Sequence, residues 1–189
     1  MNMRIVSLLL IVLVSGSLQG CFPVVAGGVG VGVMMAQDRR TSGAYVEDQA
    51  IETKAFDRIG KQYKDVHVNV TSFNRNVLIS GEVQSEAVKA EIGRLVSGIE
   101  NVRNVSNELI ISGPSSLTSR SSDSLITSDV KLRFVQDKRF DADHVKVVTE
   151  NGTVFLMGIV KRAEADAATE VASMTGGVQR VVKLFEYLD

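Results

Sequence analysis

The side chains best suited to catalysis or metal binding are few in this sequence, and they form no recognisable constellation. The chain has two histidines, His67 and His144, and a single cysteine, Cys21. Neither histidine lies near a serine or cysteine nucleophile in a known motif, and no group of cysteines and histidines has the spacing of a metal site. The carboxylates are scattered without a pairing that could divide acid and base roles. We therefore predict that the protein is not an enzyme, with no catalytic residue, no metal site and no cofactor.

Two further kinds of ligand are disfavoured. The segment GGVGVG at residues 27–32 is faintly similar to a phosphate-binding loop, but it lacks the lysine and the strand–helix context of such loops. The formal net charge of −1 gives no electrostatic basis for binding nucleic acid. We therefore expect no nucleic-acid partner.

The cysteine suggests a modification rather than a reaction. Arg4 gives the N-terminus a positive charge, and the apolar run 5–14 that follows is too short to span a bilayer but has the length of a signal-peptide core. The tetrapeptide Leu18-Gln19-Gly20-Cys21 then resembles the bacterial lipobox, whose cysteine is lipidated. We predict a signal peptide over residues 1–20 and lipidation of Cys21. The alternative is an ordinary secretory signal followed by an unrelated cysteine.

Lipidation would fix where the rest of the chain works. Several acyl chains on one cysteine anchor a protein stably, because each buried methylene contributes about 0.8 kcal/mol. Residue 22 is Phe, not the Asp that retains similar lipoproteins in the inner membrane, so we expect an outer-membrane anchor with the body facing the periplasm. Residues 21–45 then comprise the lipidated cysteine and a glycine-rich tether. The uncharged part of the tether, 22–36, could contact the membrane, pack on a partner or act as a flexible spacer.

The rest of the chain contains one pattern twice. Val68-Asn69-Val70 and the run 77–83 recur as Val145-Lys146-Val147 and 154–160, each 77 positions later. The two histidines keep the same offset. A serine-rich stretch without apolar periodicity separates the copies, and a repeat of fixed period indicates two homologous domains. We place the first domain at residues 46–113, a linker at 114–123 and the second domain at 124–189.

Each copy shows periodicities in the same order. Apolar residues at every fourth position, as at Ile51, Ala55 and Ile59, predict a first helix. Two alternating β-branched runs follow, and in the second copy the hairpin signal Asn151-Gly152 joins them. We therefore predict an α+β fold of two tandem domains, each α-β-β-α-β, with two helices packed on a three-stranded mixed sheet. The elements after the first helix are expected at 66–71, 77–83, 86–96 and 105–112 in the first copy, and the last two of the second copy at 164–174 and 181–188.

At this level the sequence resembles a known family. The order of elements, the glycines Gly81 and Gly158 in the second strand, and the segment 149–158 (TENGTVFLMG) are similar to BON domains. Two such domains behind a lipobox resemble the outer-membrane lipoproteins of the DolP family, over nearly the whole chain. The resemblance implies a non-enzymatic, periplasm-facing protein that supports outer-membrane integrity. It also implies binding of anionic phospholipid through the first helix of the second domain, and gathering at division sites.

The residues of that helix suit such a role. At about 100° per residue, Ile126, Val130 and Phe134 form a core-facing stripe, and a second apolar stripe lies on the opposite side. Aliphatic side chains edged with cations are what a helix at a membrane surface needs. The first helix of the first domain instead carries a mixed charged face, including Glu47, Asp48 and Glu52, which we expect to be solvated. The predicted phospholipid-binding residues are Leu125, Lys131, Leu132, Val135, Lys138 and Arg139.

Two other interpretations of the second stripe stay open. It could pack against the first domain and fix the pair of domains. It could instead bind a protein, which would make the chain a periplasmic adaptor for an envelope-assembly or cell-wall-hydrolase-regulating partner. Docking on anionic lipid should weaken with salt, whereas a hydrophobic protein interface should not.

Overall fold

The computed structural model describes residues 38–64, 66–113 and 115–189, and it contains the predicted unit twice. The first copy consists of α3 (Ser42–Gln62), β1 (His67–Phe73), β2 (Asn76–Val83), α4 (Glu86–Ser97), β3 (Asn104–Asn107) and β4 (Ile110–Ile111). The second consists of α5 (Leu117–Gln136), the short 3₁₀ helix η2 (Ala142–His144), β5 (Val145–Glu150), β6 (Thr153–Val160), α6 (Arg162–Ser173) and β7 (Arg180–Tyr187). The α+β fold with two tandem domains is thereby confirmed. The predicted signal peptide, Cys21 and most of the tether lie outside the described residues.

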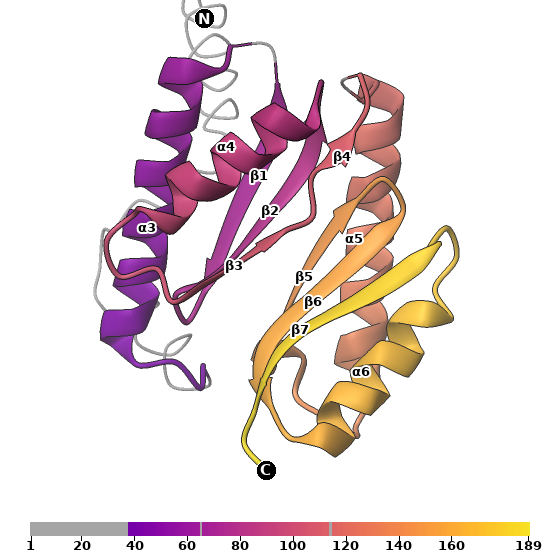
Figure 1. The fold of residues 1–189 in the computed structure, drawn as a ribbon. Helices are drawn as coiled ribbons and strands as arrows, with labels where there is room; N and C mark the ends of the chain where they lie inside the picture. The colour runs from indigo at the N-terminus through magenta and orange to yellow at the C-terminus, as the bar shows by residue number, and fades with distance from the viewer. Residues whose placement is uncertain (1–37, 65, 114) are drawn as a thin grey trace, which may run out of the picture. The chain divides into compact units, whose positions relative to one another are not determined.

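In each domain the two helices cover one face of a mixed sheet (Figure 1). The central strands β2 and β6 pair antiparallel with β1 and β5, and parallel with the strands that follow the second helix. The last strand of the first domain, expected as one run, is divided into β3 and β4. Between them Leu109 turns into the core beneath the helices, while Ile110 and Ile111 resume pairing beside β2. None of the helices in the described ranges is long and apolar enough to cross a membrane.

Both first helices begin earlier than the sequence patterns predict. Helix α5 starts at Leu117, inside the segment expected to be a linker, and the Ser116 side chain caps it by accepting a hydrogen bond from the backbone N–H of Ser119. Helix α3 starts at Ser42, inside the predicted tether, and Thr41 caps it in the same way. The serine-rich segment therefore forms the first turns of α5, although it has no apolar periodicity. The capping serine, rather than an apolar stripe, defines where this helix begins.

A buried aspartate in each first helix holds the hairpin of its domain. Asp48 was expected on a solvated face, but it is buried and accepts hydrogen bonds from the backbone N–H groups of Asn74 and Arg75 at 2.8 and 2.7 Å. Asp123 does the same for Asn151 and Gly152. All four turn residues have positive φ, between 51° and 69°, as the predicted tight hairpin turn requires. The N–H groups of such a turn converge, and a carboxylate on the neighbouring helix satisfies them.

The two glycines in the second strands are required by a close backbone approach. A Cβ atom at Gly81 would lie 2.0 Å from the carbonyl oxygen of His67, and one at Gly158 would lie 2.4 Å from that of His144. Gly81 also has a φ of +115°, which side chains rarely tolerate. The same contact in both copies explains why the repeat retains glycine at this position.

The faces of the sheets that the helices leave open pack against each other. Phe73 and Leu78 of the first domain form a buried cluster with Phe155 and Met157 of the second. Polar contacts surround it, including a hydrogen bond from Asn74 to Glu186 at 2.8 Å and an ion pair of Lys146 with Glu52 at 3.2 Å. The sheets, rather than the second stripe of α5, therefore join the two domains, and the interpretation that the stripe packs on the first domain is wrong.

Candidate membrane-docking surface

Helix α5 presents aliphatic side chains on the side opposite its core face. Leu117, Leu125, Leu132 and Val135 are 80, 72, 57 and 62% exposed, whereas Ile126, Val130 and Phe134 are buried. At about 100° per residue these four lie within an arc of about 80°, centred about 180° from the core face. We call these four residues the aliphatic strip. It runs about 27 Å along the helix, from residue 117 to 135.

The aliphatic strip carries no charge of its own. Ser121 and Ser128 lie within its arc and Ser124 lies about 20° outside it, and all three are exposed. All three serines donate their hydroxyl groups to backbone carbonyls of α5, at 2.9, 3.0 and 2.9 Å, which lowers their need for water. Leu117 was missed by the sequence patterns because it falls in the segment expected to be a linker. The surface is therefore longer than the three residues predicted.

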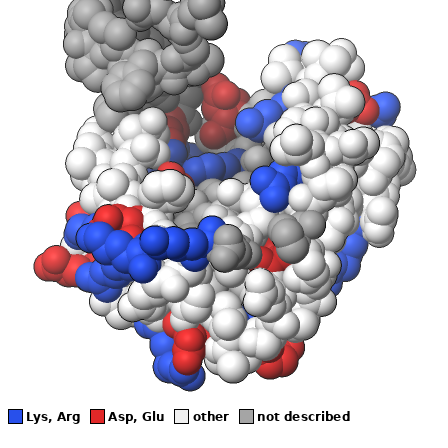
Figure 2. Space-filling model, turned by 90° about the horizontal axis from the view of Figure 1, so that it is seen from above, with Lys and Arg blue, Asp and Glu red and all other residues white. Residues whose placement is uncertain are grey.

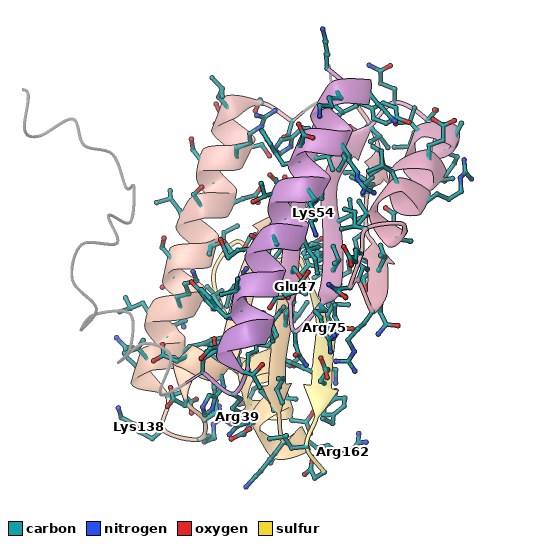
Figure 3. All side chains as sticks on the ribbon, turned by 90° about the vertical axis from the view of Figure 1, so that its left-hand side faces the viewer. Arg39, Glu47, Lys54, Arg75, Lys138 and Arg162 are labelled. Atoms are coloured by element: carbon teal, nitrogen blue, oxygen red, sulfur yellow. The ribbon has the colours of Figure 1, made fainter. Side chains whose placement is uncertain are left out.

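The predicted cations divide into two groups. Lys131 is exposed on the helix, about 40° from the edge of the strip, and no carboxylate of the described residues lies within ion-pair distance of it. Lys138 is also exposed, in the loop after α5, as Figure 3 shows. Both are available to an anionic ligand. Binding of phospholipid by these residues stays a prediction.

Arg139, by contrast, is already paired. Its guanidinium contacts Asp137 at 2.8 Å and Glu170 at 2.7 Å. These hydrogen bonds lower the pKa of Asp137 and raise that of Arg139, so both groups stay charged. The prediction assumed that the helix continues, but α5 ends at Gln136 because Asp137 is extended and its carboxylate accepts the backbone N–H of Arg139 at 2.8 Å. Arg139 therefore does not lie on the face of the strip, and its charge is offset.

A cavity of about 420 Å³ lies beside the strip, between α5 and the start of α3. Lys131 and Val135 border it on one side, and Arg40 and Tyr45 on the other. Arg40 is held by Asp38 and Asp48 and stacks on Phe73 at 4.1 Å, so its charge is already paired. The lining also includes Asp143 and Lys146, and Lys146 pairs with Glu52 at 3.2 Å. Among the described residues at this opening, Lys131 is the cation without an ion-pair partner.

The segment before α3 is fastened to the second domain. Arg39 forms two hydrogen bonds with Glu164, at 2.6 and 2.8 Å, and a third with the carbonyl oxygen of Ile159. The bond from Arg39 lowers the pKa of Glu164 to about 2. The chain that leads toward Cys21 therefore leaves the described unit next to α6, in the domain that carries the strip.

The remaining titratable groups include three that are buried between the sheets. His67 is largely buried and contacts Glu82 at 2.8 Å. Glu150 of the second domain lies 3.6 Å from the same ring nitrogen. Burial raises the pKa of Glu150 and the charge of Glu82 adds to this, while a hydrogen bond from Asn69 and the charge of His67 oppose it. The equivalent histidine, His144, has a buried Nδ1 with no hydrogen-bond partner.

On the face drawn in Figure 2, the charges of the described residues are mixed in sign. In the view of Figure 2, Lys and Arg side chains lie in several separate groups, many with Asp or Glu beside them. The first helix of the first domain shows the same mixing, since Lys61 pairs with Asp57 at 2.6 Å. Its exposed apolar side chains are Tyr45, Val46 and Phe56, at 39, 63 and 79% exposed, with Val46 the one aliphatic residue among them. The contrast between the two first helices, expected from the sequence, is present in the structure.

Comparison with known proteins agrees with the architecture. The BON domain family matches residues 47–113 and 122–189. The outer membrane lipoprotein DolP of Haemophilus influenzae is 40% identical over 175 residues, which cover 91% of this chain and 91% of that protein. The 21 kDa hemolysin of Actinobacillus pleuropneumoniae is 32% identical, covering 80% and 79% of the two chains. The osmotically-inducible protein Y of Escherichia coli is 30% identical, covering 74% and 72%. With two BON domains and this identity over nearly its whole length, the chain belongs to the BON-domain family, as an outer-membrane lipoprotein of the DolP family.

Proposed function

We propose that the protein is not an enzyme and that it docks on anionic phospholipid through α5 of its second domain, while lipidated Cys21 anchors it to the outer membrane. The observation that carries this proposal is the aliphatic strip, which is exposed along the whole helix while the opposite face fills the core. A small domain exposes few contiguous aliphatic side chains without a partner for them. A role in outer-membrane integrity, at division sites, is the part of the proposal that rests on the family resemblance.

The magnitudes suit a domain that is already tethered. Full burial of one Leu or Val side chain contributes about 1.5–3 kcal/mol, and four partly inserted side chains supply a fraction of that each. Lys131 and Lys138 add about 1 kcal/mol each near an anionic surface. Such binding is weak for a free protein. With Cys21 in the same membrane, the high effective concentration makes it sufficient.

The test is liposome flotation with the unlipidated unit Gln37–Asp189. The fragment has to include Arg39 and Arg40, because both pair with carboxylates of the folded unit. We expect flotation with vesicles that contain anionic phospholipid, little flotation with neutral vesicles, and a decrease as salt is raised. Circular dichroism checks that every variant is folded.

Two sets of variants locate the surface. Changing Leu125, Leu132 and Val135 together to Asp should lower the bound fraction at least tenfold, since a loss of about 1.4 kcal/mol is enough for that factor. Phe56→Asp is the matched control, because it places a charge at an equally exposed apolar position of the other first helix. Lys131→Glu with Lys138→Glu should weaken binding to anionic vesicles, and Lys64→Glu should not.

The outcomes separate lipid from protein as the occupant. If the folded triple variant floats as well as the parent, α5 is not the docking surface. If the parent never floats with any vesicle, lipid docking is refuted, and the adaptor role through the same strip becomes the function to test. Binding that is unaffected by salt and headgroup charge would refute the part assigned to the lysines.

A further inference from the structure

One end of the contact between the sheets holds buried carboxylates where the internal repeat has apolar side chains. Glu82 and Glu150 are 2 and 7% exposed. The position of Glu82 in the second copy holds Ile159, and the position of Glu150 in the first copy holds Phe73, each 77 residues away. Both apolar residues belong to the cluster that joins the sheets. The fold therefore accepts apolar side chains at these positions, and packing alone gives no reason for two glutamates.

These glutamates converge on one histidine. His67 and Glu82 are cross-strand partners in β1 and β2, and Glu150 comes from β5 of the other domain. Nδ1 of His67 lies 2.8 Å from Oε2 of Glu82 and 3.6 Å from Oε1 of Glu150, and one donor atom from each residue lies within 4.8 Å of the other two. Donor atoms around a tetrahedral Zn²⁺ with bonds of about 2.0–2.2 Å are about 3.3–3.6 Å apart. Small rotations of the three side chains would reach that geometry.

The charges of this group are poorly compensated by protein. Within the ranges that the structure describes, neither glutamate forms an ion pair with a lysine or arginine, and His67 is the sole basic partner. Oε1 of Glu82 is buried without any hydrogen-bond partner. A buried carboxylate oxygen that has lost water and gained no donor destabilises the fold. A cation bound at this point would balance the negative charge of the two carboxylates and would give the buried carboxylate oxygen a partner.

We propose that His67, Glu82 and Glu150 bind a divalent transition-metal ion between the two domains, with Zn²⁺ as the best-matched ion. One imidazole nitrogen and two carboxylate oxygens form a donor set that Zn²⁺ accepts, with water in the fourth position. Binding at Nδ1 moves the ring proton to Nε2. The amide nitrogen of Asn69 lies 3.3 Å from Nε2 and donates to Oε2 of Glu150 at 2.9 Å, so the Asn69 side chain has to turn and give up the bond to Glu150 before its oxygen accepts that proton. Ser115 lies beside these donor atoms, with its backbone N–H 3.2 Å from Oε2 of Glu82 and its hydroxyl oxygen 3.2 Å from Nδ1 of His67.

The ion would have a route in and a structural effect. A cavity of about 310 Å³, bordered by Gly81 and Glu150, lies next to the group. Because the ligands come from both domains, the bound ion would fasten one sheet to the other at the end of their contact that lacks apolar packing. Because the ion binds the folded chain and not the unfolded one, its binding would stabilise the protein against unfolding.

The experiment uses the full-length protein in detergent, without affinity tags, stripped with EDTA and then given Zn²⁺. Bound zinc is measured by elemental analysis after desalting, and stability by thermal unfolding. We expect one zinc per chain and a rise of about 5–10 °C in the unfolding midpoint when free zinc exceeds its dissociation constant about 100-fold. Co²⁺ in place of zinc should give the absorption bands of a tetrahedral site.

Three variants decide the assignment. His67→Ala and Glu150→Gln should each lose the zinc and the shift in midpoint, and Glu150→Gln keeps the shape of the side chain if His67→Ala does not fold. His144→Ala, which removes the other histidine of the chain, should keep both. The proposal is overturned if the parent retains no zinc, if Glu150→Gln binds zinc as the parent does, or if His144→Ala loses zinc while folded.

Discussion

Replacing Asp48 with alanine tests whether the buried aspartate holds the first domain together. Its carboxylate accepts hydrogen bonds from the Ser72 hydroxyl at 2.6 Å and from two N–H groups of the hairpin turn, and it pairs with Arg40 at 2.8 Å. Each donor left without a partner costs about 1–3 kcal/mol. At about 1 kcal/mol for each of the three donors, and a further contribution from the unpaired charge of Arg40, the free energy of unfolding should fall by about 4 kcal/mol.

The equivalent change in the second domain should cost less. Asp123 accepts from two backbone N–H groups, which gives about 2 kcal/mol for Asp123→Ala by the same arithmetic. Urea unfolding followed by circular dichroism measures both. Asp57→Ala is the control on the same helix, because Asp57 is exposed and its pair with Lys61 contributes about 0.5 kcal/mol or less. A cost for Asp48→Ala within 1 kcal/mol of this control would refute the reasoning.

Two further predictions concern the backbone and the N-terminal segment. Gly81→Ala should destabilise the fold by about 3 kcal/mol or more, measured by thermal unfolding, since its Cβ would meet the carbonyl oxygen of His67 at 2.0 Å. The pair of Arg39 with Glu164 lowers the pKa of Glu164 to about 2, so its stabilising effect is present above the unfolded value of about 4.5 and is lost as pH falls toward 2. The difference in unfolding midpoint between the parent and Glu164→Gln should therefore shrink over that range, and a constant difference would count against this pairing.

Much of the fold could be predicted because its signals are local. Apolar spacing, alternating β-branched runs and the Asn151-Gly152 turn each act over a few residues, and the repeat supplied the first two of these signals twice. The start of α5 could not be found this way, because a capping serine and a buried aspartate, rather than an apolar stripe, define its first turns. The burial of Asp48 depends on a hairpin more than twenty residues away. A signal was present, however, since an aspartate lies in the first helix of both copies.

The candidate surface was predicted in part. Helical spacing placed Leu125, Leu132 and Val135 on an exposed face, because a helix keeps its period whatever it packs on. It failed for Arg139, since nothing in the local sequence marks the end of α5, and the pairing with Glu170 joins separate elements. The group of His67, Glu82 and Glu150 was out of reach, because its members are 15 and 68 positions apart and meet through the contact between sheets.

The fastening of Arg39 to Glu164 determines how a pull on the chain would be transmitted. Tension from the membrane side enters the described unit at its first residues, where Arg39 meets α6 before the chain turns into α3. Arg40, the next residue, is held by Asp38 and by Asp48 of α3, so the same segment transmits force to the first domain as well. A pull on this segment is therefore shared between the two domains.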